Sequence, residues 1–336
     1  MAIASYADED PVADGRRDTR FAAVDLLRGT AIVAMVIYHI AFDLSAERLI
    51  VTDVAGDLAW KVFARTIAGT FLLLVGISLV LATRRGFKRD PFLRRLALIV
   101  GAAALVSLGT WWFNPETFVF FGILHEIAVA SVLALPFLWL PSVAVAAVAA
   151  LVIAAPWFLA NPVFNTPALW WVGLSTEPPV TVDYVPIFPW FGVVLAGIVA
   201  GRILVTYGAA LARWRPANVL AHWLTFASRW SLVIYLAHQP LIVGTISLAL
   251  PYLPADEGVA RANFMSQCVA ACRPDRDEAT CTAFCGCMFE GLYGTELFAM
   301  NSFAEMSPVQ RETFDGILAL CNTPAPPSAS EPALEN

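Results

Sequence analysis

Residues 66–82 read TIAGTFLLLVGISLVLA, a run of 17 residues without a charged side chain. An α-helix rises about 1.5 Å per residue, so roughly 20 mostly apolar residues cross a hydrocarbon core of about 30 Å. The run lies within a longer apolar segment, residues 58–82, that reaches this length. We therefore predict a transmembrane helix over residues 58–82.

Other segments of the chain resemble this one in length and apolar character. They bring the predicted transmembrane helices to about seven: 22–43, 58–82, 92–112, 118–139, 141–160, 186–206 and 230–253. The fourth and fifth segments follow each other so closely that they could form one hairpin or a re-entrant element. Composition agrees, because 59% of the residues are hydrophobic and 14% are charged, against roughly 45–50% and about 25% in soluble domains. The sequence predicts an all-α, polytopic helical membrane protein whose surroundings are the lipid bilayer.

Basic residues are distributed unevenly between the predicted loops. One cluster comprises Arg84, Arg85, Lys88, Arg89, Arg94 and Arg95, and a second comprises Arg202, Arg213, Arg215 and Arg229. Residues 113–117 and 161–185 contain no lysine or arginine. Because cytoplasmic loops of membrane proteins are enriched in basic residues, we expect both clusters inside. With seven spans, the N-terminus is then cytoplasmic and the C-terminus lies outside.

All six cysteines lie in the last 69 residues of the chain. An even number of cysteines in a segment predicted to lie outside favours disulfides, which form in oxidising compartments. Cysteines four residues apart share one face of a helix, so two such pairs can staple a helical hairpin. We predict bonds between Cys268 and Cys285, between Cys272 and Cys281, and between Cys287 and Cys321. A zinc site built from four of the thiolates is the alternative.

The last of these cysteines is predicted to end a helix of its own. Ser307, Pro308 and Gln310 form a helix-start signal upstream of it. We divide the chain into a polar N-terminal arm (1–20), a transmembrane domain (21–253), a Cys-rich helical tail (254–322) and a disordered C-terminus (323–336). The tail could simply stabilise itself, or it could bind a protein partner outside the membrane.

Ionisable side chains within a bilayer are costly, so those inside predicted spans are candidate functional residues. The first span contains four polar residues within an arc of about 60° on the helix surface: Asp25, Arg28, His39 and Asp43. Arg28 can pair with Asp25, and Asp43 can pair with His39 and fix its tautomer. His39 lies about 16 Å farther across the membrane than Arg28. Alternatively, the first pair is a plain interfacial ion pair and Asp43 an interfacial cap.

Later spans contribute three more candidates. His125 and Glu126 lie in the fourth predicted span and His238 in the seventh, at depths where they could converge with His39. The alternative is that each histidine bonds only a backbone carbonyl of a neighbouring helix. We interpret His222, in a basic loop, as a surface residue.

Four short motifs resemble a known family when taken in order. They are DLLRG at 25–29 with an arginine and a histidine eleven residues apart, FGILH at 121–125, DYVPIFPW at 183–190 and SLVIYLAHQP at 231–240. The first resembles the first-helix signature of the transmembrane acyltransferase superfamily. The others look like its bacterial branch related to the catalytic domain of heparan-alpha-glucosaminide N-acetyltransferase. The resemblance covers about residues 20–250, and the Cys-rich tail is not part of the family pattern.

This resemblance implies transfer of an acyl group, most simply acetyl, from cytosolic acyl-CoA to a glycan or amino-sugar acceptor across a bacterial inner membrane. It implies that Arg28, with Asp25, contacts the donor phosphates and that His39 is the candidate base. Asp43, His125, Glu126 and His238 complete the candidate catalytic set. We expect no metal and no nucleic-acid partner, and the tail would be periplasmic.

Two other functions fit the same residues. A polar stripe with histidines and carboxylates also suits a proton-coupled transporter or flippase. A non-catalytic membrane protein whose tail recruits a partner is the third possibility.

Overall fold

The computed structural model describes residues 21–252, 257–300 and 306–322 and divides into two compact units. The membrane unit comprises Met1–Ala41 and Ala55–Thr245, and the tail unit comprises Phe42–Val54 and Ile246–Asn336. The predicted N-terminal arm and disordered C-terminus lie outside the described residues.

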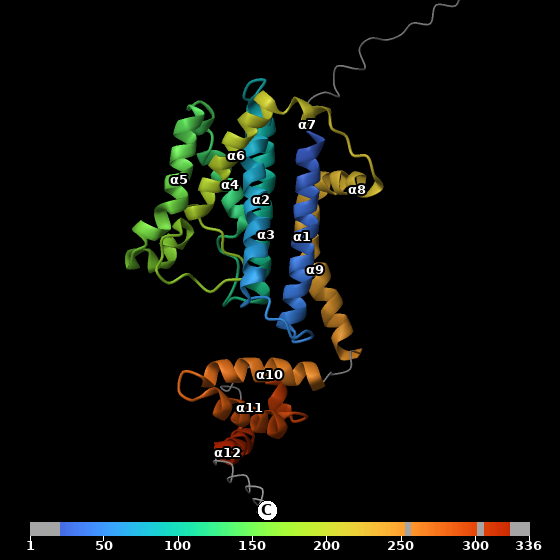
Figure 1. Ribbon diagram of the computed structural model, residues 1–336, viewed down its shortest axis with the longest axis vertical. Helices are drawn as coiled ribbons and strands as arrows, with labels where there is room; N and C mark the ends of the chain where they lie inside the picture. Colours follow the sequence, from blue (N-terminus) through green and yellow to red (C-terminus); the bar gives the residue numbers. More distant parts are fainter. Residues whose placement is uncertain (1–20, 253–256, 301–305, 323–336) are drawn as a thin grey trace, which may run out of the picture. The chain divides into compact units, whose positions relative to one another are not determined.

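Helices make up every regular element of the membrane unit (Figure 1). In order they are α1 (Ala22–Ala46), α2 (Leu58–Thr83), α3 (Arg89–Phe113), α4 (Ile123–Leu133), η1 (Pro136–Leu138), α5 (Ser142–Leu159), η2 (Pro162–Asn165), η3 (Pro167–Val172), α6 (Ile187–Tyr207), α7 (Ala209–Arg213), α8 (Val219–Ala227), η4 (Ser228–Trp230) and α9 (Ser231–Ala249). Within the described part of the chain, six helical segments are long and apolar enough to cross a membrane: α1, α2, α3, α5, α6 and the segment Val219–Ala249. The prediction of an all-α, multi-pass membrane protein is confirmed.

The fourth predicted span, residues 118–139, is not one long helix. Its helix α4 has 11 residues, too few to cross a bilayer alone. The backbone N–H of Ile123, at its start, donates to Asp183 just before α6. At its other end the carbonyls of Phe137 and Leu138 accept hydrogen bonds from Arg202, near the end of α6. Helix α4 and η1 together therefore run alongside α6 over about 22 Å.

The chain breaks its helix beside two prolines, Pro136 and Pro141. A break in the helix leaves carbonyl oxygens without partners, which is costly away from water. Besides those two carbonyls, the Arg202 guanidinium also binds the Leu140 carbonyl at 2.7 Å and the Ser142 hydroxyl at 3.1 Å. One side chain therefore satisfies the backbone at the point where the fourth pass turns into α5.

Helices α2 and α6 form the closest contact of the core. A Cβ atom on Gly76 would collide with the carbonyl oxygen of Val194, and one on Gly197 with that of Leu73. Small residues at such positions let helix backbones approach closely within a membrane, where dispersion contacts rather than the hydrophobic effect hold helices together. Around this contact lies the main buried cluster, to which α2, α4, α5 and α6 contribute.

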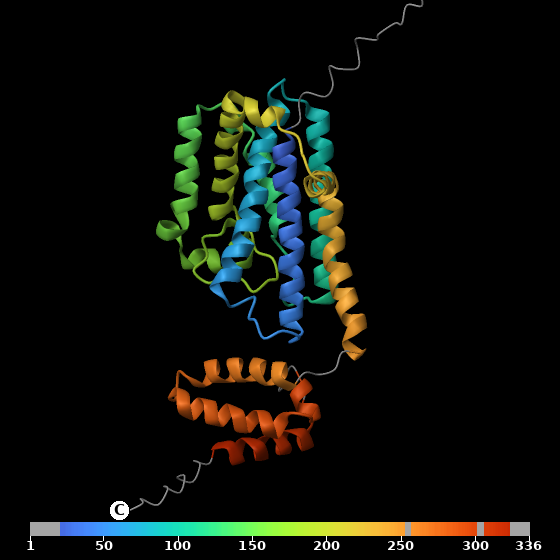
Figure 2. The ribbon, with the colours of Figure 1, turned by 45° about the vertical axis from the view of Figure 1, so that its right-hand side comes forward.

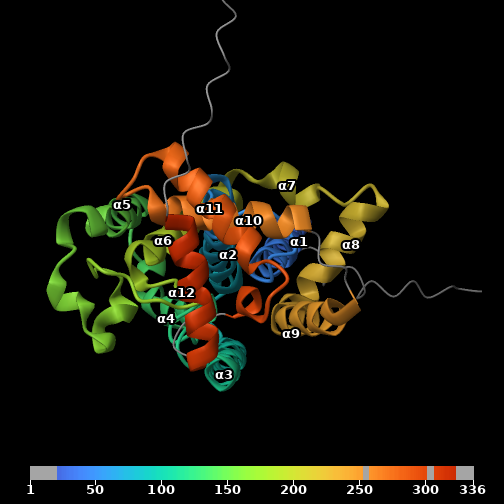
Figure 3. The ribbon, with the colours of Figure 1, turned by 90° about the horizontal axis from the view of Figure 1, so that it is seen from below.

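Helix α9 completes the unit by contacting α1 and α3 (Figure 3). It follows α8, which lies across the long helices in Figure 1 and is seen end-on in Figure 2. The segment Val219–Ala249 is therefore bent, and its 19-residue part α9 supplies the membrane-crossing length of about 28 Å.

The tail unit contains α10 (Glu257–Cys272), α11 (Glu278–Leu292), η6 (Glu296–Ala299) and α12 (Pro308–Asn322) (Figure 2). Disulfides join Cys268 to Cys285, Cys272 to Cys281 and Cys287 to Cys321, as predicted. The zinc alternative is wrong, because all six cysteines are used in these bonds. The predicted start of α12 is also confirmed, since Ser307 and Gln310 exchange hydrogen bonds between side chains and backbone.

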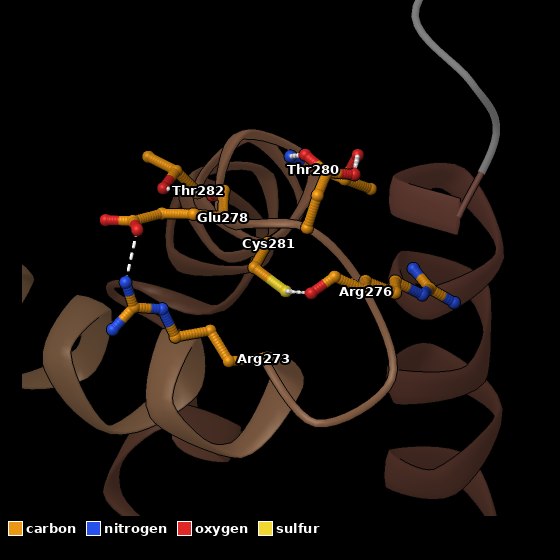
Figure 4. A network of polar contacts seen from close by, with 7 residues as sticks. Arg273, Arg276, Glu278, Thr280, Cys281 and Thr282 are labelled. Atoms are coloured by element: carbon orange, nitrogen blue, oxygen red, sulfur yellow. Dashed lines mark hydrogen bonds and ion pairs between the residues drawn. The ribbon is translucent and has the colours of Figure 1, made fainter.

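The turn between α10 and α11 is held by polar contacts (Figure 4). Arg273 pairs with Glu278, and Asp277 caps α11 by accepting hydrogen bonds from the backbone N–H and the hydroxyl of Thr280. The hydroxyl bond is the main cause that lowers the pKa of Asp277. The sulfur of Cys281, which has no proton in its disulfide, lies 3.9 Å from the carbonyl oxygen of Arg276.

The loop that follows α1 folds with the tail unit, which the sequence did not predict. Asn263 of α10 is buried, and its amide donates to the carbonyls of Arg48 and Ile50 at 3.3 and 3.1 Å. At the end of α1, the hydroxyl of Ser45 donates to the carbonyl of Thr52 in this loop at 2.7 Å. The tail helices therefore hold a loop more than 200 residues away in the sequence, since these bonds span separations of 215 and 213.

The disulfides predict how the tail responds to cysteine removal. Replacing both Cys268 and Cys285 by Ser should destabilise the tail by about 2–5 kcal/mol, because one cross-link of its unfolded state is lost. Membrane insertion should be unchanged, since the apolar helices are intact. Hydrogen exchange over residues 257–322 of the full chain measures the effect, with Thr282→Ser on the exposed face of α11 as control. Unchanged protection in the double variant would contradict the prediction.

The glycine contact predicts a second stability difference. Gly197→Ala should lower the thermal stability of the membrane unit by about 1–3 kcal/mol, because the new methyl group must push α2 and α6 apart. Gly101→Ala is the matched control, since a Cβ atom at Gly101 meets no atom within 4 Å. Thermal unfolding of both variants in detergent gives the comparison, and equal midpoints would show that the contact adapts without cost.

Candidate functional site

The polar stripe of α1 begins with an ion pair. Arg28 binds Asp25 at 3.2 Å, as predicted from their spacing, and donates to the hydroxyl of Ser78 on α2 at 2.9 Å. The Arg28 side chain keeps 23% of its surface exposed. Its five-donor guanidinium is therefore oriented by protein groups yet accessible to a further anion.

Farther along the same helix, His39 lies beside His238 of α9. Their ring centroids are 4.7 Å apart, with an edge-to-face angle of 73°. The structure thus brings together two of the histidines expected to converge, although they are 199 positions apart in the sequence.

Backbone carbonyls determine the tautomers of both rings. Nδ1 of His39 lies 2.9 Å from the carbonyl oxygen of Met35, and Nδ1 of His238 lies 2.6 Å from that of Tyr235. A carbonyl only accepts, so Nδ1 carries the proton in each ring and Nε2 carries the lone pair. Both imidazoles are in the form that can accept a proton at Nε2.

Asp43 lies one turn beyond His39 on α1, and its side chain is buried. The sequence predicted that this carboxylate would fix the His39 tautomer. In the structure the Nδ1 hydrogen bond goes instead to the carbonyl of Met35, within the same helix.

A second polar cluster surrounds His125 at the start of α4. Its Nδ1 accepts from the backbone N–H of Gly122 at 3.3 Å, so its Nε2 is protonated and donates to the hydroxyl of Ser107 at 3.2 Å. That hydroxyl donates in turn to the carbonyl of Val119 at 2.6 Å. Nδ1 of His125 therefore caps the start of α4, and Nε2 holds α3 against it.

Asp183 joins this cluster from the loop before α6. Its carboxylate accepts from the backbone N–H of Ile123 at 2.9 Å, and a Cβ on Gly122 would occupy the same space. A parallel bridge pairs Phe121 with Tyr184, so two motifs about 60 residues apart meet here. Burial raises the pKa of Asp183, and the hydrogen bond from Ile123 opposes that rise. Asp183 was absent from the candidate residues, although its motif had been noted.

Glu126 follows His125 directly but points into different surroundings. Successive helix residues are 100° apart, and Glu126 shares its face with Ile123 and Ala130 of the main core. Its side chain is 0% exposed, and neither carboxyl oxygen has a hydrogen-bond partner among the described residues. A carboxyl group in such a position is costly, which makes it a functional candidate.

The described residues contain no group of three or more His, Cys, Asp or Glu that could hold a metal ion. The arrangement consists of a partly exposed arginine, two adjacent imidazoles with basic Nε2 atoms and a buried carboxyl group. These groups can bind an anion at one depth and move a proton at another.

Fold and site together define a multi-pass membrane protein with a histidine pair between α1 and α9. Residues 20–240 match the family model of heparan-alpha-glucosaminide N-acetyltransferase, catalytic. The chain belongs to this family, which confirms the resemblance seen in the four motifs and supports a membrane acetyltransferase-type function. Comparison with curated proteins finds no match, and comparison with solved structures finds none either.

The unpaired carboxyl group predicts an unusual stability change. Glu126→Leu should stabilise the membrane unit by about 1–3 kcal/mol, because it removes a buried polar group without a partner while keeping a similar volume. Thermal unfolding in detergent measures this, with the exposed Glu116→Gln as control. Destabilisation by Glu126→Leu would mean that the carboxyl group is stabilised by its surroundings.

Proposed function

We propose that the protein is a transmembrane acyltransferase that takes an acetyl or related acyl group from acyl-CoA on one side of the membrane. The acceptor is a glycan or amino sugar on the other side. We assign the arginine-rich end and the N-terminus to the cytoplasm of a bacterial inner membrane and the disulfide-bonded tail to the periplasm. The clustering of basic residues and the need of disulfides for an oxidising compartment support this orientation.

The observation that carries the proposal is the pair of His39 and His238 within the helices of a family member. Both rings hold their Nδ1 proton on a backbone carbonyl, so each Nε2 atom carries the lone pair that can accept a proton. The two rings lie 4.7 Å apart, so both imidazoles are available at the same depth. The geometry favours proton transfer at this depth.

The proposed reaction needs one base and one leaving thiolate. Nε2 of His39 removes the proton from the acceptor hydroxyl or amine as its oxygen or nitrogen attacks the thioester carbonyl. The carbon–sulfur bond breaks, and the thiolate of coenzyme A receives the proton from the His39 imidazolium. The ester or amide product and the free thiol then leave, and His39 is neutral again.

Arg28 supplies the donor end of the proposed site. Its guanidinium fork matches two phosphate oxygens at once, and Asp25 with Ser78 holds it in orientation. It lies eleven residues before His39 on α1, about 16 Å away along the helix. This separation suits a long donor whose phosphates and thioester lie at opposite ends.

The remaining candidates receive distinct roles in the proposal. His238 is a positioning residue whose ring packs against His39, and Asp43 lies at the far end of the same stripe. His125, with Asp183, positions the start of α4 rather than acting as a base. Glu126 is the reserve candidate for proton transfer should His39 prove dispensable.

A proton-coupled transporter or flippase is the second candidate, favoured by the buried carboxyl group of Glu126. Such groups form proton relays in pumps and transporters. In that case flux across a vesicle membrane would depend on a pH gradient. Substitution of Arg28 or His39 would then leave acyl-CoA binding and acyl transfer unchanged.

Two substitutions on α1 separate donor binding from transfer. Arg28→Lys should weaken acyl-CoA binding about tenfold, because the charge remains while the two-pronged contact is lost. His39→Ala should leave donor binding nearly intact and lower turnover by roughly 100-fold or more, the scale of a positioned general base. Isothermal titration with acyl-CoA and an acyl-transfer assay on the purified protein measure the two effects.

Arg85→Lys is the matched control for Arg28→Lys. Arg85 is exposed just beyond the end of α2, the end at which Arg28 binds Ser78. It should leave both binding and transfer unchanged. Full transfer activity in His39→Ala would remove this residue from the mechanism and direct attention to Glu126.

A further inference from the structure

Helix α8 carries a surface pocket that the proposed transfer does not use. It has a volume of about 510 Å³ and is lined by Val219, His222, Trp223, Thr225, Phe226 and Arg229. Sites for small molecules commonly measure about 300–1,000 Å³. Half of the lining is apolar or aromatic and one residue is a cation, so the pocket suits an amphiphile with a negative charge.

The helix that carries the pocket lies across the long helices rather than along them (Figures 1 and 2). Large apolar side chains are exposed along it: Val219, Leu220, Trp223, Phe226 and, just beyond its end, Trp230. A helix with an aromatic, apolar face that lies across spanning helices is typical of a membrane interface.

Its packing on α1 gives the depth of α8. Gly29 of α1 touches the backbone of Leu224, and a Cβ there would collide with the Leu224 carbonyl oxygen. Gly29 is seven residues from the start of α1 at Ala22, or about 10 Å along the helix. Interfacial helices lie about 5–10 Å into the boundary between headgroups and acyl chains, which agrees with this crossing.

The pocket opens away from α1. At 100° per residue, Ala221, Leu224 and Ser228 lie within about 60° of one another, and they form the side that meets the bundle. Trp223 and Phe226 lie on the opposite side, and Trp223 is 66% exposed. The pocket therefore faces the surroundings of the protein, not the interior that contains the histidine pair.

Arginine supplies the charge at this surface. Arg229 is exposed and makes no hydrogen bond or ion pair with any residue that the structure describes. Arg213 and Arg215 add two more positive charges in the segment between α6 and α8. A guanidinium group binds phosphate oxygens in a two-pronged manner, and anionic lipids collect near basic segments at the membrane surface.

We propose that this pocket binds the headgroup of an anionic phospholipid from the leaflet at the arginine-rich end. The phosphate lies on Arg229, and an acyl chain runs along Trp223 and Phe226. A lipid fits better than a free phosphate, because a small ion would leave the aromatic wall in water. The site is separate from the proposed transfer reaction, so either can fail alone.

Native mass spectrometry of the full chain, titrated with phosphatidylglycerol or phosphatidylcholine, tests this site. We expect one phosphatidylglycerol molecule to bind at least tenfold more tightly than phosphatidylcholine. Arg229→Gln should abolish this preference, and Trp223→Ala should weaken binding of the lipid about tenfold. Arg213→Gln, which removes a nearby charge outside the pocket, should keep the preference.

Equal binding of both lipids, or equal losses from Arg229→Gln and Arg213→Gln, would overturn the proposal in favour of general charge attraction. Displacement of phosphatidylglycerol by coenzyme A, one for one, would also overturn it. The pocket would then belong to a soluble phosphate compound rather than a lipid.

Discussion

The hydrocarbon interior of a membrane offers no hydrogen-bond partner to a peptide group, and the rest of this structure depends on that constraint. It accounts for the helical form of every long element in the membrane unit. It also explains the position of Arg202, whose guanidinium binds the carbonyls of Phe137, Leu138 and Leu140 where the chain leaves the helix. The fourth pass can be a short helix and a turn only because this side chain satisfies the backbone at its end.

The same constraint sorts the polar side chains into those with a structural partner and those without. His125, Ser107 and Asp183 exchange hydrogen bonds with the backbone around the start of α4, and they hold two distant motifs together. Glu126 differs from them, since both of its carboxyl oxygens lack a hydrogen-bond partner among the described residues. The cost of such a group makes Glu126 a candidate functional residue.

The pairing of His39 with His238 could be anticipated only as a possibility. Both residues lie inside apolar segments, which marks them as candidates, but neither spacing nor composition says which helices are neighbours. The contact exists because α9 packs against α1, which depends on the bend after α8 and on contacts with α3 and α4. The role of Asp183 could not be predicted for a similar reason. Its partner is the backbone N–H of Ile123, and every residue except proline has such a group, so the sequence gives no sign of the contact. The loop held by Asn263 likewise involves carbonyl groups that any residue could provide.

The sequence by itself determined that this is a membrane protein, because apolar runs of about 20 residues are long enough to cross a bilayer and are uncommon in soluble domains. It also predicted the three disulfides, two of them from the i, i+4 spacing of cysteines, with a zinc site as the alternative, and it predicted the start of α12 from local capping. Its ordered motifs were enough to indicate the family, which the match over residues 20–240 establishes. Only the tertiary structure showed how much of residues 118–139 is helical, that α8 lies across the bundle and which polar groups of different helices meet. These features arise from contacts between helices far apart in the chain, and periodicity within one helix carries no information about its neighbours.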